Sequence, residues 1–161
     1  MSGRERPEVL APAGNWEALR AAVANGADAV YFGLSNFNAR HRATNFSLEE
    51  LPQVMDFLHE RNVRGYVTCN TLIFSEELPE LVEYVRRLNE SRVDAVIVQD
   101  LGLAQLIHRM APGLPIHGST QMTLTEPRGI DFVDGLGVER VILARELTLE
   151  EIGKITNAVK I

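Results

Sequence analysis

The stretch Val141-Ile142-Leu143-Ala144-Arg145-Glu146 joins three aliphatic residues to two opposite charges. Three aliphatic residues in a row are typical of a parallel strand that is buried on both faces. Arg145 and Glu146 end it, although burying an unpaired charge costs several kcal/mol. The pattern therefore predicts a buried strand that ends at the rim of a pocket, where Arg145 and Glu146 can face each other, water or a ligand.

Five more short apolar runs precede this one, and longer segments with helical periodicity separate them. The six runs are residues 9–11, 29–32, 65–68, 95–98, 115–117 and 141–143. The helical segments begin near Asn15, Ser47, Ser75, Asp100, Thr125 and Thr148. The spacings Ser47–Glu50 and Thr148–Glu151 match the capping box, a signature of a helix start. Strict alternation of strand and helix predicts an α/β fold with a parallel sheet.

The linkers into the strands also resemble one another. Gly26-Ala27-Asp28-Ala29-Val30 recurs as Arg92-Val93-Asp94-Ala95-Val96 and, more loosely, as Gly137-Val138-Glu139-Arg140-Val141. Each linker closes a helix and places one acidic residue near the start of a strand. Because no linker-like or low-complexity segment divides the chain, we expect residues 1–161 to form a single domain.

The strand ends favour a barrel over a doubly wound open sheet. A dinucleotide-binding sheet would carry Gly-x-Gly-x-x-Gly after its first strand, where Pro12-Ala13-Gly14 stands instead. Polar residues follow nearly every strand, and a barrel gathers all its strand exits around one mouth. A complete barrel has eight units and this chain supplies about six. The sequence therefore predicts an incomplete, TIM-like parallel (β/α) barrel.

The composition is that of an ordinary globular protein, with 45% hydrophobic and 24% charged residues among 161. The formal charge of −6 argues against binding nucleic acid by bulk electrostatics, although a local basic groove remains open. Cys69 is the sole cysteine, so the chain can form neither an internal disulfide nor a cysteine-based cluster. We expect a cytoplasmic protein without a signal peptide or membrane span.

Six segments follow one another along the chain: "VLAPAGNWEALRAAVANGADAVYFG", "NARHRATNFSLEEL", "YVTCNTLIFSEEL", "DAVIVQDLG", "LPIHGSTQMT" and "RVILARELTLEEI". In this order they resemble peptidase family U32, the collagenase-like peptidases. The resemblance runs from about Glu8 to Ile155 and identifies the N-terminal barrel of that family. The family's Gly- and Cys-rich signature would begin after Ile161. The resemblance thus implies a truncated barrel without the complete active site.

The resemblance implies two kinds of activity for a full-length parent. One is peptidase activity on collagen-like substrates. The other is hydroxylation of a pyrimidine base in transfer or ribosomal RNA, and related branches act in oxygen-independent ubiquinone hydroxylation. Several of these branches are associated with an iron-sulfur cluster, which implies such a cluster in the parent but no cofactor within this chain. The "ARH…N" loop and "VQDLG" look most like the branch that hydroxylates ribosomal RNA.

Four residues are candidates for catalysis: Arg145, Glu146, Asp100 and His117. Arg145 and Glu146 can instead form a structural ion pair at a strand end, although an arginine fork suits a carboxylate or phosphate. Asp100 can act as a helix N-cap or a general base. His117 can belong to a hydrogen-bonded core layer or to the site.

Seven residues are candidates for substrate binding: Arg40, His41, Asn45, Asn70, Gln99, Ser119 and Gln121. Arg40, His41 and Asn45 lie in one loop whose basic residues suit an anionic ligand such as a nucleotide backbone. Asn70 and Gln99 follow strands, where turn formation and helix capping are the alternative roles. Ser119 and Gln121 alternate with His117 and share one face of a strand. No zinc motif is present, and we predict no metal site.

A non-enzymatic role also remains open. An unclosed sheet leaves two edge strands, which can pair with another chain. If this chain is a folded scaffold without activity of its own, we expect it to self-associate through these edges.

Overall fold

A computed structural model of the chain describes residues 6–39 and 45–161. Within these described residues, six strands alternate with six α-helices. The strands are β1 (Leu10–Pro12), β2 (Ala29–Gly33), β3 (Arg64–Cys69), β4 (Ala95–Val98), β5 (Ile116–Gly118) and β6 (Val138–Val141). The helices are α1 (Trp16–Ala24), α2 (Leu51–His59), α3 (Leu78–Glu90), α4 (Leu101–Met110), α5 (Pro127–Asp134) and α6 (Leu149–Ala158). Two 3₁₀ turns, η1 (Ser75–Glu77) and η2 (Thr120–Met122), lie in the loops after β3 and β5.

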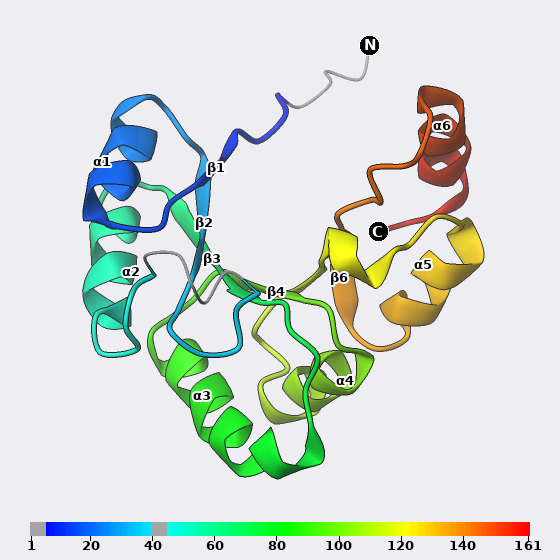
Figure 1. Cartoon of the computed structure of the whole chain (residues 1–161). Coiled ribbons are helices and arrows are strands. Elements are labelled where there is room, and N and C mark those ends of the chain that lie inside the picture. The colour runs from blue at the N-terminus through cyan, green and yellow to red at the C-terminus, as the bar shows by residue number, and fades with distance from the viewer. Residues whose placement is uncertain (1–5, 40–44) are drawn as a thin grey trace.

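The sheet follows the order of the chain, with β1 to β6 as successive parallel neighbours. A doubly wound sheet would reverse its strand order at a switch point, and no such reversal occurs among the described strands. The helices form an arc around the outside of the strands, from α1 to α6 (Figure 1). The predicted α/β class with TIM-like barrel architecture is confirmed.

The curved sheet has apolar side chains on both of its faces. Those that point outward, such as Phe32, Val67 and Val96, are buried against the helices in the larger hydrophobic cluster. A smaller cluster of Ala29, Tyr66, Ala95 and Ile97 lies on the inner face, with Tyr31 and Ile142 packed against it. This alternation places the residues two apart along each strand on the inside of the barrel.

Side chains cap the helices largely where the sequence predicts. Asn15 accepts a hydrogen bond from the backbone N–H of Ala18 at 2.8 Å, and Asp100 accepts one from Leu103 at 2.8 Å. The two reciprocal bonds of the Thr148–Glu151 capping box are present. The Ser47–Glu50 pair also forms both of its bonds, although α2 begins only at Leu51. These caps fix the direction in which each helix leaves the strand ends.

The interpretation of Val141-Ile142-Leu143 as a strand buried on both faces is wrong. The strand β6 covers Val138–Val141, and residues 141–143 are only partly buried. The physical reason is position: β6 is the last strand of the described sheet and pairs only with β5. Arg145 and Glu146 therefore follow an edge strand.

Candidate functional site

A cavity of about 700 Å³ opens at the carboxyl ends of the strands. Its floor is apolar and includes Tyr31, Ile97 and Ile142, which belong to the inner face of the sheet. Its walls are polar and come from residues that follow β2, β3, β5 and β6 or end these strands. The exits of β2, β3, β5 and β6 therefore meet around one mouth, as predicted.

Five of the predicted site residues lie in this cavity. Asn45, Asn70, Ser119, Gln121 and Arg145 all line it, although they come from four different loops. Asn70 accepts a hydrogen bond through Oδ1 from the backbone N–H of Ala39 at 3.2 Å, which ties the loop after β2 to the end of β3. Arg40 and His41, which follow Ala39 in the sequence, lie outside the described residues.

Asn38 forms part of the wall and was missed by the sequence analysis. It is 4% exposed, and its Nδ2 donates to Asn45 Oδ1 at 2.8 Å. The hydroxyl of Thr68 lies 3.2 Å from the carbonyl of Phe32 and 3.4 Å from Asn38 Oδ1, so it joins β2, β3 and the loop. Gly33 leaves the room for this arrangement, because a Cβ there would overlap the Asn38 amide. A buried asparagine over a glycine has no periodicity by which the sequence could reveal it.

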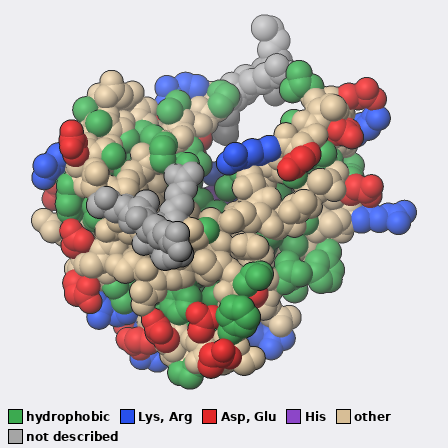
Figure 2. All heavy atoms as spheres, in the orientation of Figure 1, with side chains coloured by type: hydrophobic (Ala, Val, Ile, Leu, Met, Phe, Trp, Pro, Cys, Tyr) green, Lys and Arg blue, Asp and Glu red, His purple; other side chains and the backbone are tan. Residues whose placement is uncertain are grey.

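The two predicted residues after β4 lie in a neighbouring hollow. Gln99 and Asp100 line a space of about 500 Å³ that shares Gln121 with the main cavity. Asp100 is occupied as the N-cap of α4, since Oδ1 accepts from Leu103 N, and Oδ2 lies 3.5 Å from Ile73 N. Hydrophobic side chains gather beside this hollow between α4 and α5 (Figure 2), and Phe132 at its edge is 61% exposed.

His117 lies on β5 below the cavity and does not line it. Its ring meets the Tyr66 ring edge-on, with centroids 4.8 Å apart, and it is 6% exposed. Burial is the main cause that lowers the pKa of His117 to about 4; the charges of Arg140 and Arg64 act in the same direction, and that of Glu8 opposes them. His117 is therefore uncharged at neutral pH, and the structure places it in the inner core layer.

Glu8 organises a charged cluster around His117. Its carboxylate pairs with Arg64, accepts from the Tyr66 hydroxyl at 2.9 Å and lies 3.4 Å from Arg140 Nη1. One side chain before β1 thus connects β3 to β6. This cluster lies at the amino ends of the strands, opposite the polar cavity, so its role in the described structure is to hold the sheet together.

Arg145 and Glu146, the two charged residues of the opening motif, have different surroundings. Arg145 is exposed and lines the cavity, whereas Glu146 is exposed and lies outside both hollows. Within residues 6–39 and 45–161, no ion pair joins the two side chains. Arg145 is therefore available to a ligand at the cavity mouth.

The described residues do not fit an iron-sulfur cluster. Such clusters require several cysteine thiolates, and the sequence has only Cys69. That side chain is buried among the outward-facing residues, where burial raises the pKa of its thiol to about 12. Among the described residues no group of three or more His, Cys, Asp or Glu side chains is placed to hold a metal ion.

No helix in the described part of the chain is both long and apolar enough to cross a membrane.

Comparisons with known proteins agree with this geometry. The chain is 36% identical over 157 residues to "tRNA hydroxylation protein P1" of Bacillus subtilis and 37% identical over 153 residues to "23S rRNA 5-hydroxycytidine C2501 synthase" of Escherichia coli. It is 32% identical over 149 residues to "Collagenase" of Porphyromonas gingivalis. These alignments cover 98%, 95% and 92% of this chain but only 37%, 23% and 35% of the relatives.

A comparison with solved structures and with family models leads to the same family. The solved structure of the U32 peptidase Mk0906 superposes with a TM-score of 0.77 at 15% identity, covering 97% of this chain and 66% of that one. A model of peptidase family U32 matches residues 14–161. The chain therefore belongs to peptidase family U32.

Proposed function

We propose that this chain is part of a protein that hydroxylates a pyrimidine base in RNA, and that its cavity holds the base. The observation that carries the proposal is the cavity itself, in which amide and hydroxyl side chains surround an apolar floor. Enzymes that modify a base in structured RNA take it out of its stack into a fitted pocket and read its edge by hydrogen bonds. The names of the tRNA- and rRNA-hydroxylating relatives support the same reading.

The cavity offers the groups that such recognition needs. Asn70 and Gln121 each present an amide, which can donate to a pyrimidine carbonyl or accept from a ring or exocyclic N–H. A volume of about 700 Å³ lies within the range of small-ligand sites. Arg145 at the mouth supplies a guanidinium for a phosphate oxygen.

The basic residues Arg40 and His41 add to this proposal from the sequence side. They follow Ala39, which lines the cavity, in a chain whose formal charge is −6. Binding of an RNA backbone by an acidic protein requires such a local excess of positive charge. We assign Arg40, His41 and Arg145 to contacts with phosphates, and Asn45, Asn70, Ser119 and Gln121 to the cavity wall around the base.

Peptidase activity is the second candidate, and the collagenase relative favours it. The described geometry offers it little chemical support. The Ser119 hydroxyl caps η2 by accepting from Gln121 N, and no hydrogen bond links it to His117 within the described residues. A histidine with a pKa of about 4 is also far from the near-neutral value that suits a general base.

The proposed hydroxylation draws on groups that this chain does not contain. Cys69 cannot hold an iron-sulfur cluster, so a cluster in the full-length parent takes its cysteines from beyond these residues. In this proposal the chain alone binds RNA but lacks activity. Its described residues bind and orient the base.

The test is complementation of a deletion strain. Full-length wild-type protein restores hydroxylated pyrimidines in transfer or ribosomal RNA, measured by mass spectrometry of nucleosides. Asn70→Ala reduces that signal at least tenfold, because it removes a wall amide, whereas the matched control Asn89→Ala, at an exposed position of α3, leaves it unchanged. Unchanged hydroxylation in the deletion strain itself overturns the proposal, and cleavage of gelatin by the purified full-length protein would support the peptidase reading.

A further inference from the structure

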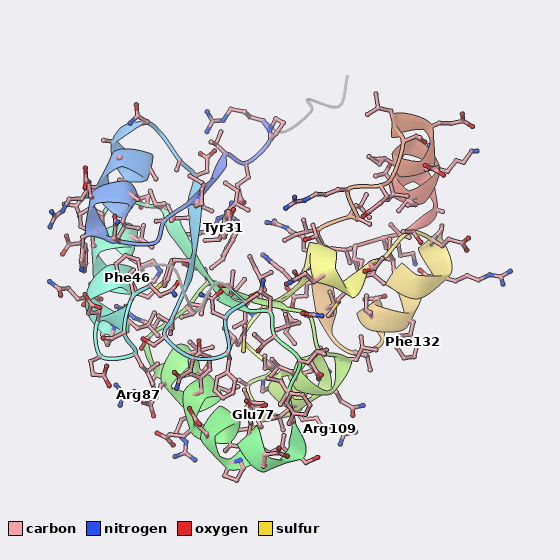
Figure 3. The ribbon with its side chains drawn as sticks, in the orientation of Figure 1. Tyr31, Phe46, Glu77, Arg87, Arg109 and Phe132 are labelled. Atoms are coloured by element: carbon pink, nitrogen blue, oxygen red, sulfur yellow. The ribbon has the colours of Figure 1, made fainter. Side chains whose placement is uncertain are left out.

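We infer that the ring of Tyr31 is the stacking platform for the pyrimidine base, an inference that rests on the proposed function. Tyr31 lies in the middle of β2, between Val30 and Phe32, and lines the cavity. In the structure its side chain points into the space that the curved sheet surrounds (Figure 3). The search for site residues after the strand ends does not identify Tyr31, because it lies two residues before the end of β2.

The ring of Tyr31 is supported from below and open toward the cavity. It packs against the inner cluster that contains Ala29 and Ile97, and Ile97 also forms the cavity floor. The ring is only partly buried, so part of its surface remains available to a ligand. Aromatic side chains held in this way bind bases that have left their stack, since every base presents a π-face.

The neighbouring Tyr66 shows what a structural tyrosine looks like in the same layer. Tyr66 pairs with Tyr31 in the β2–β3 register. Its hydroxyl donates to Glu8 at 2.9 Å, its ring meets His117, and it is 2% exposed. Within residues 6–39 and 45–161, the Tyr31 hydroxyl forms no comparable hydrogen bond. The fold thus uses one tyrosine for packing and leaves the other facing the cavity.

Of the two described aromatic residues that line the cavity, Tyr31 is the more exposed. Phe32 lines the cavity as well, but its side chain is 1% exposed and its ring packs edge-on against Phe46 at 5.5 Å. A base that stacks on Tyr31 lies over the apolar floor, and its edge then reaches toward the amides of Asn70 and Gln121 in the wall. Stacking fixes the plane of the base, and the amides select its edge.

The experiment measures binding of cytidine and uridine 5′-monophosphates to the full-length protein by isothermal titration calorimetry. Tyr31→Leu keeps an apolar side chain but removes the π-face, and it weakens binding about 5- to 150-fold, the range for loss of one base–aromatic stack. Tyr31→Phe keeps the ring and binds as wild type does. Ribose 5-phosphate, which lacks the base, binds wild type and Tyr31→Leu equally.

Three outcomes would overturn the inference. They are equal binding of the nucleotides by Tyr31→Leu and wild type, an equal loss with ribose 5-phosphate, and no nucleotide binding by wild type. Thermal unfolding of each variant shows that the fold is retained. If Tyr31→Leu restores RNA hydroxylation fully while Asn70→Ala does not, the stacking role fails and the proposed function stands. If deletion leaves hydroxylation unchanged, the proposed function itself fails.

Discussion

Gly33 makes the polar wall of the cavity possible. Its missing side chain leaves the space that Asn38 occupies, and the paired Asn38 and Asn45 amides then cover the end of β2. Buried amides of this kind are stable only when their hydrogen bonds are made. The shape of the wall therefore depends on one absent methyl group.

Replacing Gly33 with alanine should disrupt this wall. The new Cβ overlaps the Asn38 amide and lies 2.9 Å from Asn45 Oδ1, so the asparagine pair must move. We expect a loss of about 1–3 kcal/mol in the free energy of unfolding, measured by urea denaturation, together with weaker nucleotide binding. Gly113→Ala is the matched control, because nothing lies within 4 Å of a Cβ at Gly113. Equal stability of Gly33→Ala and wild type would contradict the expectation.

His117 makes stability depend on pH. Its folded pKa of about 4 lies below its unfolded value, so the unfolded chain binds the proton more tightly between these values. The free energy of unfolding should therefore fall as the pH falls from about 6.5 to 4, with a slope of up to about 1.4 kcal/mol per pH unit.

Chemical denaturation at several pH values checks this, with His117→Gln as the comparison. The groups around His117 are Arg64, Tyr66, Arg140 and Glu8, and the variant leaves all of them in place. Subtracting the His117→Gln curve removes the contributions of other carboxylates, including Asp28 and Glu50, whose pKa values are lowered by backbone hydrogen bonds. Parallel curves for the two proteins between pH 4 and 6.5 would rule the effect out.

Sequence reasoning placed the residues at strand ends well and missed those within the fold. Asn45, Asn70, Ser119, Gln121 and Arg145 line one cavity because parallel strands bring their exits together. Asn38 and Tyr31 reach the same cavity from a loop and from mid-strand. Their positions depend on a glycine gap and on the curvature of the sheet, and neither leaves a pattern in one sequence.

The linkers before the strands act as a repeated element. Gly26, Arg92 and Gly137 begin the three recurring linkers, and each has a positive φ, +84°, +56° and +89°. This left-handed residue ends the preceding helix and turns the chain into the next strand. In the first two copies the following aspartate then accepts a backbone N–H of the neighbouring strand region: Asp28 from Val9 at 2.8 Å and Asp94 from Gly65 at 2.7 Å.

Substitutions at the first residue of two linkers should change the free energy of unfolding in opposite directions. Arg92→Gly relieves a non-glycine residue at φ +56° and should raise the free energy of unfolding by about 0.5–1 kcal/mol. The lost ion pair with Asp56 is exposed and contributes little. Gly26→Ala, which meets no atom within 4 Å, should lower the free energy of unfolding by about 1 kcal/mol through its φ alone. Shifts of the same sign in urea denaturation would refute this account.

The repeat explains why the elements were predictable from sequence. Alternating apolar runs, caps and acidic linkers all indicate the same strand–helix unit, and consistent local signals specify a fold. The predicted burial at the end of β6 was wrong, because burial on both faces depends on neighbouring strands and the sequence of β6 carries no information about them. Local patterns identified the elements, whereas their burial was decided by the whole sheet.

At the scale of the molecule, β1 and β6 are the two unpaired edges of the described sheet. The edges differ. The backbone of Val9 and Ala13 bonds to β2: Ala13 N donates to Tyr31 O, and Val9 O accepts from the backbone N–H groups of Asp28 and Ala29. Because alternate residues of a strand in a parallel pair turn their backbone groups to opposite sides, the backbone nitrogen of Pro12 faces away from β2, toward the open edge. Proline has no N–H to donate there, which protects β1 against pairing. β6 has no proline.

We therefore predict that this chain self-associates, and that it does so through β6. Light scattering over a range of concentrations should detect dimers or larger assemblies. Hydrogen–deuterium exchange should then show protection of residues 138–143 at high concentration, with residues 10–12 as the internal comparison. A monomer at all concentrations, or equal protection of both edges, would contradict the prediction.

The bonds of Glu8 carry a consequence for how the molecule assembles during translation. Strands that neighbour one another along the chain also pair in the sheet, so each βα unit can dock as soon as it leaves the ribosome. Glu8 has its partners Arg64 and Tyr66 early, but Arg140 is synthesised 132 residues later. The ion pair between residues 8 and 140 is thus the last of these bonds to form, and nascent chains that stop before β6 should hold the first strand less firmly than the finished protein does.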